Sequence, residues 1–279
     1  MTVAVVGGGG FLGTNLVETL GDCRIIEKGD PLLFSGVDAV VHLAANADVR
    51  NGWADPTRDL ESNVLLTSRV LEAMRLYDVP KLVFASSGSV YAPKTGPIPE
   101  TDPVHATSLY AASKIAAEQL VAAYTTAGHF DATVLRFVSV LGPHYSHGLL
   151  CDFLAKLAET PDHLDVIGPG TSQKSYVHVS DVVRAIELVL PRRERFEILN
   201  VGTNETATPL DIASWITDAE VRIVGDTWVG DNPHILLNCS ELRALGWAPE
   251  WTIREAVEDT TNWLGANHDT YRRIPARAR

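Results

Sequence analysis

A glycine-rich turn, GGGGFLG, begins at Gly7, directly after a short apolar run and directly before an amphipathic stretch. The run Val3 to Val6 predicts a strand, and the stretch from about Leu12 to Leu20 predicts a helix. Gly7, Gly10 and Gly13 stand three residues apart, which permits positive φ angles, close approach of the backbone to a phosphate, and tight packing of the helix on the strand. Because a helix N-terminus offers unpaired N–H groups to an anion, this order of elements predicts a dinucleotide-binding turn rather than a glycine turn without a ligand.

A second apolar run, Arg24 to Ile26, predicts a strand that ends at Glu27. An acidic residue at this place is typical of sites that bind the ribose hydroxyls of NAD. Its carboxylate repels a 2′-phosphate, so NAD is favoured over NADP, although Lys28 beside it carries the opposite charge. The sequence therefore predicts NAD as the cofactor.

Further apolar runs of strand length alternate with helical stretches along the first two-thirds of the chain. The predicted strands are Asp38 to Ala44, Lys81 to Ser86, Ala132 to Phe137 and Phe196 to Val201, and the predicted helices cover about 57–77, 110–127 and 180–190. Apolar strands separated by helices predict a parallel sheet covered on both faces, the doubly wound α/β fold. Ligands of such folds bind at the carboxyl ends of the strands, where Ala44 to Asn46, Ser86, Ser87 and Ser139 fall.

Composition excludes several classes of partner. The chain has 279 residues, 46% of them hydrophobic, which is enough for a large core, and a net charge of −12. That charge argues against binding to nucleic acid and to anionic membranes. No apolar run reaches membrane-spanning length and no signal peptide precedes the glycine turn, so a cytoplasmic protein is expected. Cys23, Cys151 and Cys239 are widely spaced without a metal-binding pattern, so we expect reduced structural cysteines and no metal.

The segment YAASK places Tyr110 and Lys114 one turn apart on a predicted helix. Side chains at this spacing can meet. A cation held beside a phenol favours the phenolate, so the pair predicts a general base that works near neutral pH.

Motifs in a fixed order along nearly the whole chain resemble those of the extended short-chain dehydrogenase/reductase family, and within it the nucleotide-sugar 4-epimerases of the UDP-glucose type. The resemblance rests on GGGGFLG, DAVVHLAAN, SNVLLT, FASSGSVY, YAASK, LRFVSVLGP, HGLLCDFLAKL, IGPGTSQKSYVHVSDV and LGWAPEWTIREAVEDTTNWL. It implies that Tyr110 exchanges a proton with the sugar O4, that Lys114 binds the nicotinamide ribose and lowers the pKa of the tyrosine, and that Ser87 is the catalytic hydroxyl.

The same resemblance implies the remaining site residues. The cofactor-binding residues are Gly7, Gly10, Phe11, Leu12, Glu27, Lys28, Leu43, Ala44, Ala45, Asn63, Ala85, Ser86, Tyr110, Lys114 and Phe137, and the substrate-binding residues are Ser87, Gly88, Ser89, Tyr110, Ser139, His147, Gln173, Lys174, Trp228 and Asp231. For Asn63 a buried structural hydrogen bond is an equal alternative, and His42, inside a strand, is expected to be a satisfied core histidine. The hydroxyl of Ser89 is expected to point away from that of Ser87, and Tyr91 is expected to be a packing residue.

The chain departs from the family pattern in ways that narrow its chemistry. Dehydratases of the family carry an Asp-Glu pair after the serine, and decarboxylases carry a Glu nearby; here Gly88 and Ser89 follow, so redox chemistry at C4 without elimination is predicted. Ser139 stands where the epimerases usually have Asn, and Trp228 stands where they usually have a phosphate-binding Arg, while Lys174 occupies another basic phosphate position. The reaction predicted is C4 epimerisation of a nucleotide-diphosphate sugar, expected to be a UDP-sugar. A one-way NAD(P)H-dependent ketoreductase or dehydrogenase is the alternative, and a non-catalytic dinucleotide sensor is disfavoured.

Between Glu27 and Asp38 the family inserts a strand and a helix, whereas this chain has only a short connection. The eight residues from Asp30 to Val37 reach at most roughly 26–29 Å, and about 20 Å is needed to return past one neighbouring strand. We therefore expect an extended crossover in which Leu32, Leu33 and Phe34 cover the sheet face that the missing helix would cover, with Asp30 near the adenine.

We expect two lobes and a homodimer. Residues 1–138 and 176–203 are predicted to form the dinucleotide-binding domain, and residues 139–175 and 204–279 a small substrate-binding lobe. The family resemblance implies a homodimer through the helices at 57–77 and 110–127.

Overall fold

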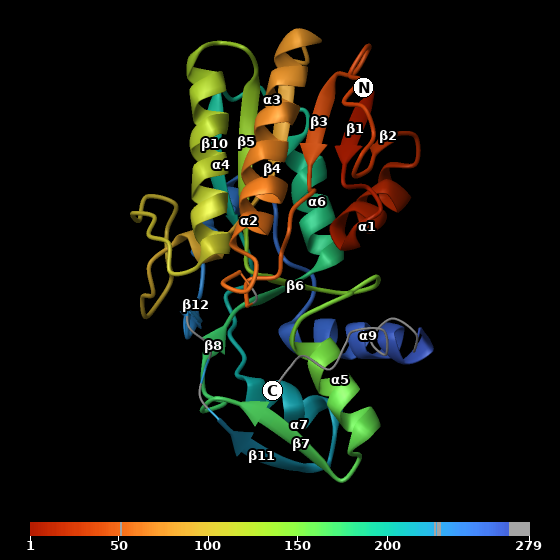
Figure 1. Cartoon of the computed structure of the whole chain (residues 1–279), viewed down its shortest axis with the longest axis vertical. Helices are drawn as coiled ribbons and strands as arrows, with labels where there is room; N and C mark the ends of the chain where they lie inside the picture. The colour runs from red at the N-terminus through yellow and green to blue at the C-terminus, as the bar shows by residue number, and fades with distance from the viewer. Residues whose placement is uncertain (51, 226, 228–229, 268–279) are drawn as a thin grey trace.

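The computed structural model describes the chain except residues 51, 226, 228–229 and 268–279. Six parallel strands form one sheet in the order β10-β5-β4-β3-β1-β2 (Figure 1). Their bounds are β1 (Val3–Val6), β2 (Arg24–Ile26), β3 (Ala39–His42), β4 (Lys81–Ser87), β5 (Asp131–Phe137) and β10 (Phe196–Val201). Each strand predicted from the sequence is present, which confirms the parallel α/β sheet.

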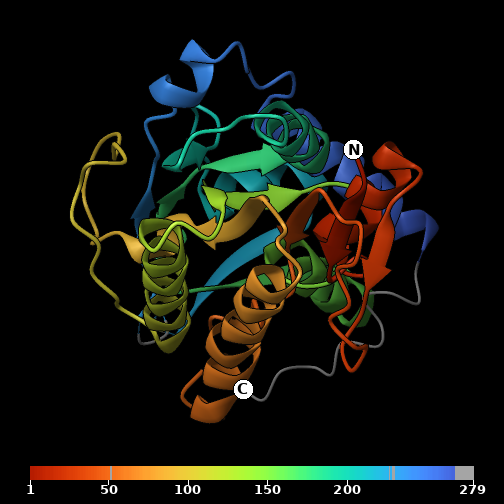
Figure 2. The same ribbon diagram turned by 90° about the horizontal axis from the view of Figure 1, so that it is seen from above.

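Helices cover both faces of the sheet, as Figure 2 shows from above. They are α1 (Phe11–Leu20), α2 (Pro56–Asp59), α3 (Leu66–Leu76), α4 (Leu109–Thr126) and α6 (Val179–Val189), with a π-helical turn, η1 (Leu60–Leu65), between α2 and α3. Successive strand residues point to opposite faces, so Val3 and Val5 pack in one core with α1 and α6, and Ala4 and Val6 pack in the other with α3 and α4. The sheet is therefore doubly wound, as predicted.

The connection from β2 to β3 has no helix, and it carries the chain past β1, which lies between these strands. Phe34 is fully buried in the core on the α3 side, and Leu32 packs partly against the same core. Leu33 is 53% exposed, so the prediction that it covers the sheet is wrong. Neighbouring residues of an extended chain point to opposite sides, and the carbonyl of Leu33 instead accepts a hydrogen bond of 2.8 Å from the Arg24 guanidinium.

A smaller lobe lies beyond the carboxyl ends of the strands (Figure 1). Its core is formed by α5 (Leu149–Glu159), β7 (His163–Ile167), α7 (Pro209–Ile216), β11 (Glu220–Val224) and α9 (Ile253–Ala266). Two-residue and three-residue strands connect it with the sheet: β6 (Ser139–Leu141) pairs with β9 (Tyr176–His178), and β8 (Gln173–Lys174) pairs with β12 (His234–Ile235). The short helix α8 (Ser240–Ala244) places Leu242 in the core on the α6 side of the sheet.

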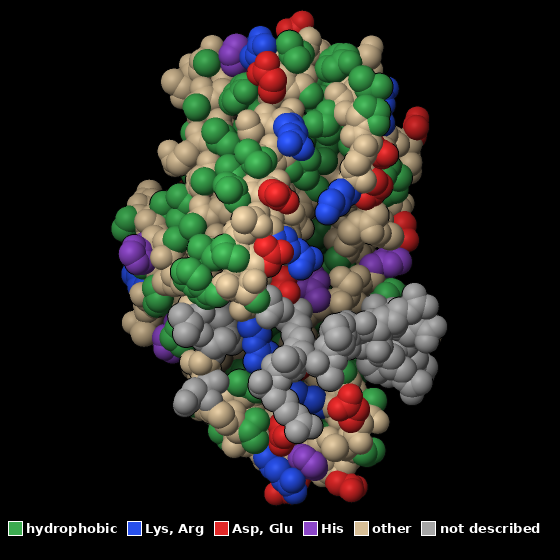
Figure 3. All heavy atoms as spheres, in the orientation of Figure 1, with side chains coloured by type: hydrophobic (Ala, Val, Ile, Leu, Met, Phe, Trp, Pro, Cys, Tyr) green, Lys and Arg blue, Asp and Glu red, His purple; other side chains and the backbone are tan. Residues whose placement is uncertain are grey.

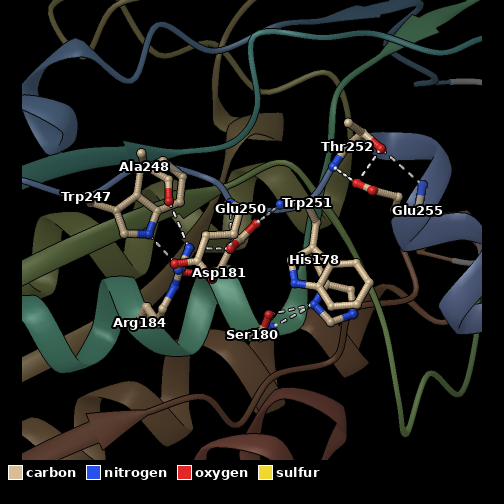
Figure 4. A network of polar contacts seen from close by, with 10 residues as sticks. All are labelled: His178, Ser180, Asp181, Arg184, Trp247, Ala248, Glu250, Trp251, Thr252 and Glu255. Carbon is tan, nitrogen blue, oxygen red and sulfur yellow. Dashed lines mark hydrogen bonds and ion pairs between the residues drawn. The ribbon is translucent and has the colours of Figure 1, made fainter.

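The start of α6 holds the C-terminal segment in place (Figure 4). The buried carboxylate of Asp181 accepts hydrogen bonds from the backbone N–H groups of Glu250 (3.1 Å) and Trp251 (3.4 Å). The ring of His178 stacks on Trp251 with 4.0 Å between centroids, and its Nε2 lies 3.1 Å from an Asp259 carboxylate oxygen in α9. These contacts join the small lobe to the sheet.

Among the described helices, none has the length and apolarity to cross a bilayer.

Candidate active site

Ser87 is the last residue of β4 and caps a 3₁₀ turn, η2 (Gly88–Val90). Its Oγ accepts hydrogen bonds from the backbone N–H of Ser89 at 3.1 Å and from the Ser89 hydroxyl at 2.9 Å. The prediction that the two hydroxyls point apart is therefore wrong: residues two apart in an extended segment lie on the same face, and the turn after Ser87 also keeps the two hydroxyls together. The side chain of Ser87 also lies close enough to the Tyr110 phenol to lower its pKa, so two of the predicted catalytic residues lie beside one another.

Helix α4 carries Tyr110 and Lys114 on its buried side. Ser108 begins the helix by accepting a hydrogen bond of 3.1 Å from the Ala111 N–H, a typical N-cap. The Lys114 ammonium donates a hydrogen bond of 2.8 Å to the Ala85 carbonyl in β4 and lies 5.0 Å from the centre of the Phe84 ring. The helix is thus attached to the end of β4 beside Ser87.

Burial controls the ionisation of this pair. It raises the pKa of Tyr110 to about 12; the Ser87 hydrogen bond opposes this shift and the charge of Asp59 adds to it. Burial lowers the pKa of Lys114 to about 8, against the attraction of Glu118 and Asp59. The prediction that Lys114 brings the phenol pKa near neutral is therefore wrong for the protein as described, because desolvation is the largest influence on the phenol and the Lys114 ammonium is bonded to the Ala85 carbonyl instead.

The glycine turn is shaped for close backbone approach. Gly7 has φ of +86°, and a Cβ placed on it would lie 2.8 Å from the backbone of Ala44, the residue that follows β3 by two. A Cβ on Gly13 would lie 2.1 Å from the Gly7 carbonyl oxygen. Gly10 caps α1 without a side-chain hydrogen bond, which leaves the first N–H groups of the helix to an anion. These features fit the pyrophosphate of a dinucleotide.

Glu27 lies against this turn, since its Oε1 accepts a hydrogen bond of 2.5 Å from the Gly9 N–H. Asp30 accepts one of 2.8 Å from the backbone N–H of Glu27, which fixes the turn that also contains Lys28. The other predicted cofactor residues occupy the same edge of the molecule: Phe11 and Leu12 begin α1, Leu43, Ala44 and Ala45 follow β3, Ala85 and Ser86 lie near the end of β4, and Phe137 ends β5. The fold therefore brings the predicted cofactor residues to the carboxyl ends of the strands.

Asn63 is 1% exposed and joins the loop after β3 to α4. Its side-chain oxygen accepts from the Asn46 N–H at 2.7 Å, and its amide donates to the Asn46 carbonyl at 3.1 Å and to the Ser113 hydroxyl at 2.8 Å. Ser113 in turn donates to the Tyr110 carbonyl at 2.7 Å. The alternative that Asn63 makes buried structural hydrogen bonds is thus confirmed, while its role in binding a ligand stays a prediction.

Sequence reasoning missed a buried ion pair between Glu118 and Arg136. Two hydrogen bonds of 2.6 and 3.0 Å join the guanidinium to the carboxylate, which also accepts from the Ser86 hydroxyl at 2.5 Å. Arg136 further donates to the Tyr91 hydroxyl at 2.7 Å, so Tyr91 is a hydrogen-bonded residue as well as a packing one. A signal was present, because Tyr110, Lys114 and Glu118 recur every four residues along one helix face.

His42 is 1% exposed, as expected of a core histidine. Its Nε2 lies 3.0 Å from the Thr67 hydroxyl, but its Nδ1 has no partner among the described residues, so it is only half satisfied. Burial and the charge of Lys114 lower its pKa to about 3, so the ring is neutral.

The predicted substrate residues are spread over several segments. Lys174 and Asp231 form an ion pair with 2.6 Å between Nζ and Oδ1. Ser139 is exposed at the start of β6, Gln173 lines a surface cavity of about 180 Å³ with Lys94 and His234, and the ring of His147 is parallel to that of Tyr145. Gly88 is buried, and a Cβ on it would lie 3.2 Å from Leu237. Trp228 lies outside the described residues.

Comparisons with known proteins agree with this geometry. The model of the NAD dependent epimerase/dehydratase family matches residues 30–202. A putative UDP-glucose 4-epimerase of Methanocaldococcus jannaschii is 28% identical, over 96% of this chain and all of its own. MoeE5 in complex with UDP-glucuronic acid and NAD is 27% identical with a TM-score of 0.88, covering 96% of this chain and 100% of that one. The UDP-glucose 4-epimerase of Thermus thermophilus in complex with NAD is 28% identical with a TM-score of 0.83, covering 95% and 99%.

Proposed function

The chain belongs to the NAD-dependent epimerase/dehydratase family and its cofactor is NAD, and from this premise we propose that it inverts C4 of a nucleotide-diphosphate sugar of the UDP-glucose or UDP-galactose type through a transient 4-keto sugar. The observation that carries the proposal is that Ser87, at the end of β4, lies beside the Tyr110 phenol and lowers its pKa, with Lys114 one helical turn away. Loss of a hydride from C4 gives a carbonyl only if the O4 proton also leaves, so a proton acceptor and a hydrogen-bond donor must meet at one oxygen.

In this proposal Tyr110 takes the O4 proton and returns it after the keto sugar has turned over in the site. Ser87 bonds to the same oxygen and keeps the phenol in place. When bound, NAD⁺ supplies the hydride acceptor and a positive charge. Because Tyr110 is buried, its pKa of about 12 responds strongly to nearby charge. In this proposal the Lys114 ammonium, one helical turn away, binds the nicotinamide ribose and favours the phenolate.

The turn after Ser87 supports epimerisation over elimination. Gly88 and Ser89 carry no carboxyl group, and Gly88 packs against Leu237. Dehydration needs a second acid and base beside the sugar, so reactions that only move a hydride are favoured.

On the substrate side we propose Lys174 as the cation for the diphosphate, with Asp231, Ser139, Gln173, His147 and Ser89 around the nucleotide sugar; Trp228, outside the described residues, stays a candidate from the sequence alone. Lys174 is already paired with Asp231. Its charge is partly neutralised, and the arginine usual in the family is absent at Trp228. This observation favours the second candidate, a one-way ketoreductase of a sugar or small metabolite.

A homodimer through α3 and α4 is proposed from the family resemblance, and the outer surface of η1 and α3 supports it. Leu60, Leu65, Leu76 and Tyr77 are large apolar side chains between 39% and 64% exposed on η1, α3 and the residue after it. Figure 3 shows hydrophobic side chains gathered on the face that these helices form. A second copy of the chain would remove them from water.

The proposal is tested by incubating the purified protein with UDP-, dTDP-, GDP- and CDP-sugars without added cofactor. Mass spectrometry of the denatured protein identifies the bound nucleotide, and chromatography separates the C4 epimers, which have equal mass. We expect one epimer pair to interconvert to equilibrium and Tyr110→Phe to be inactive. Turnover only with stoichiometric consumption of reduced cofactor would support the ketoreductase, and full activity of Tyr110→Phe would refute the catalytic assignment.

A further inference from the structure

The β6–α5 loop, residues 142–148, reaches from the end of β6 to α1. One residue separates β6 from the end of β5, whereas α1 begins after the glycine turn at the end of β1, and β4 and β3 lie between these two strands. In Figure 1 the loop passes from β6 toward α1 before α5 begins. It therefore extends past the row of strand ends that carries the predicted cofactor residues, yet its contacts with α1 have no part in the proposed reaction.

Asn15 bonds this loop to the first turn of α1. Its side-chain amide nitrogen donates hydrogen bonds to the Phe11 carbonyl at 2.9 Å and to the Pro143 carbonyl at 3.0 Å. The first bond is local to the helix, but the second joins residues 128 apart in the sequence. Because the side chain is half-buried, its removal would take the donor from the Pro143 carbonyl without giving that carbonyl free access to water.

Tyr145 supports the same turn from the small lobe. Its ring contacts that of Phe11 edge-on, with 5.6 Å between centroids and an interplanar angle of 90°, an arrangement that aromatic pairs favour. Tyr145 is buried in the core of the small lobe, and Phe11 packs against this core. Phe11 is also the first residue of α1, where the unpaired N–H groups of the helix lie. A side chain of the small lobe thus holds the residue at which the predicted phosphate site begins.

Other contacts of the loop are weaker or serve its own shape. His144 Nε2 lies 3.2 Å from Glu18 Oε1 in α1, but the Glu18 side chain is 61% exposed, so this ion pair contributes little. A Cβ placed on Gly148 would lie 2.2 Å from the Tyr145 hydroxyl oxygen, so only glycine allows α5 to begin this close to the phenol. The restraint on α1 therefore rests on Asn15 and Tyr145.

The start of α1 needs such a restraint if it is to hold an anion tightly. Gly10 precedes Phe11 without a side-chain cap, and a turn of four consecutive glycines loses more backbone freedom on ordering than other sequences do. Support that fixes the turn before the ligand arrives lowers the cost of binding.

We propose that the β6–α5 loop fastens the first turn of α1 to the small lobe, and that Asn15 and Tyr145 are positioning residues for the NAD phosphates that slow the release of NAD. The inference requires NAD as the cofactor but no particular sugar. It deepens the proposed function, because an epimerase that returns the same hydride must keep its cofactor through the cycle.

The test measures release of the cofactor directly. Protein loaded with NADH is mixed with a large excess of NAD⁺, and the loss of the fluorescence of bound NADH gives the dissociation rate. We expect Tyr145→Leu to release NADH about fivefold to tenfold faster than the wild type, because the edge-on ring contact is lost. Tyr145→Phe keeps the ring and should release NADH as the wild type does. Ile212→Ala, in α7, opens a cavity in the same core and should also leave the rate unchanged.

Asn15→Ala and Thr19→Ala form a second matched pair in α1. The Thr19 side chain is exposed and its hydroxyl donates a 3.0 Å hydrogen bond to the Asn15 carbonyl within the helix. Both substitutions raise the helix propensity, but only Asn15→Ala removes a bond to the loop. We expect about threefold to tenfold faster release of NADH from Asn15→Ala and wild-type release from Thr19→Ala.

Wild-type release rates in both Tyr145→Leu and Asn15→Ala overturn the proposal. So does an equal acceleration in Ile212→Ala, since release would then follow the stability of the small lobe and not the contact with α1. If Tyr145→Leu does not fold, the comparison of Asn15→Ala with Thr19→Ala decides, and equal rates in these two variants refute the role of the loop. No sugar enters the measurement, so a protein that shows the expected rates but epimerises no nucleotide sugar refutes the proposed function alone.

Discussion

The Lys114 ammonium donates a 2.8 Å hydrogen bond to the Ala85 carbonyl, so a residue of α4 is fastened to β4 two residues before the strand ends at Ser87. The bond crosses from the helix to the sheet inside the protein, where Lys114 is only 3% exposed. The relative position of Tyr110 and Ser87 is consequently fixed by the fold.

Lys114→Met is expected to lower kcat at least about 100-fold, because the chain loses the buried cation beside the proton-transferring phenol. In the wild type, the charged form of Lys114 disappears as the pH rises through its pKa of about 8, so activity should fall over the same range. Steady-state kinetics between pH 6 and 10 measure both effects. Lys156→Met, which removes a more exposed lysine paired with Asp152, is the control and should behave as the wild type.

Ser87→Ala should lower kcat more than Ser89→Ala does. Ser87 acts on the Tyr110 phenol directly, whereas Ser89 donates to Ser87 and acts through it. We expect kcat to fall about 100-fold for Ser87→Ala and about 10-fold or less for Ser89→Ala. Equal losses, or a larger loss for Ser89→Ala, would show that Ser89 is the hydroxyl at the sugar.

The sheet and its covering helices were predictable because each strand is a continuous apolar run and each helix has an apolar stripe, which are local patterns. The misplacement of Leu33 came from treating three neighbouring apolar residues as one block, although an extended segment alternates its side chains. For the crossover from β2 to β3, the length of the chain showed only that a return past one neighbouring strand was feasible.

The site was less predictable where it depends on burial. Asp59 is an acid on a short helix whose other residues are exposed, and nothing local in the sequence shows that it faces inward. Glu118 could have been identified, because it continues the four-residue spacing of Tyr110 and Lys114. The pKa of Tyr110 could not be inferred from its spacing to Lys114, since desolvation by the surrounding core dominates it. The π-helical turn that orients Asn63 depends on tertiary packing.

Gly13→Ala and Gly265→Ala are a matched pair of substitutions in helices. A Cβ on Gly13 would lie 2.1 Å from the Gly7 carbonyl oxygen, so the glycine turn must open and NAD affinity should fall at least about 100-fold. A Cβ added to Gly265, in α9, would meet no atom within 4 Å outside its own helix, so alanine there should stabilise the protein by about 0.5–1 kcal/mol. Calorimetric titration with NAD and thermal unfolding measure the two effects. Tight NAD binding by Gly13→Ala would contradict the placement of the pyrophosphate.

Lys81 makes the stability of the protein depend on pH in a direction opposite to that of a paired surface lysine. It is fully buried at the start of β4, and its ammonium donates a 2.7 Å hydrogen bond to the Thr133 hydroxyl. Burial lowers its pKa to about 8, and Glu197 and Asp131 only partly oppose this. Between that pH and the unfolded value of about 10.4 the unfolded chain binds more protons, so the free energy of unfolding should rise with pH, by at most about 3 kcal/mol.

Lys81→Met tests this dependence because it removes the titrating group and keeps most of the side-chain volume. Lys114 contributes a slope of the same sign, so the quantity to measure is the difference between wild type and variant in urea unfolding from pH 7 to 10. The variant should be the more stable at pH 7, and the difference should shrink toward pH 10 as the wild-type lysine loses its proton in the folded state. A difference that does not change with pH would mean that Lys81 keeps its proton throughout this range, with its charge fully balanced by Glu197 and Asp131.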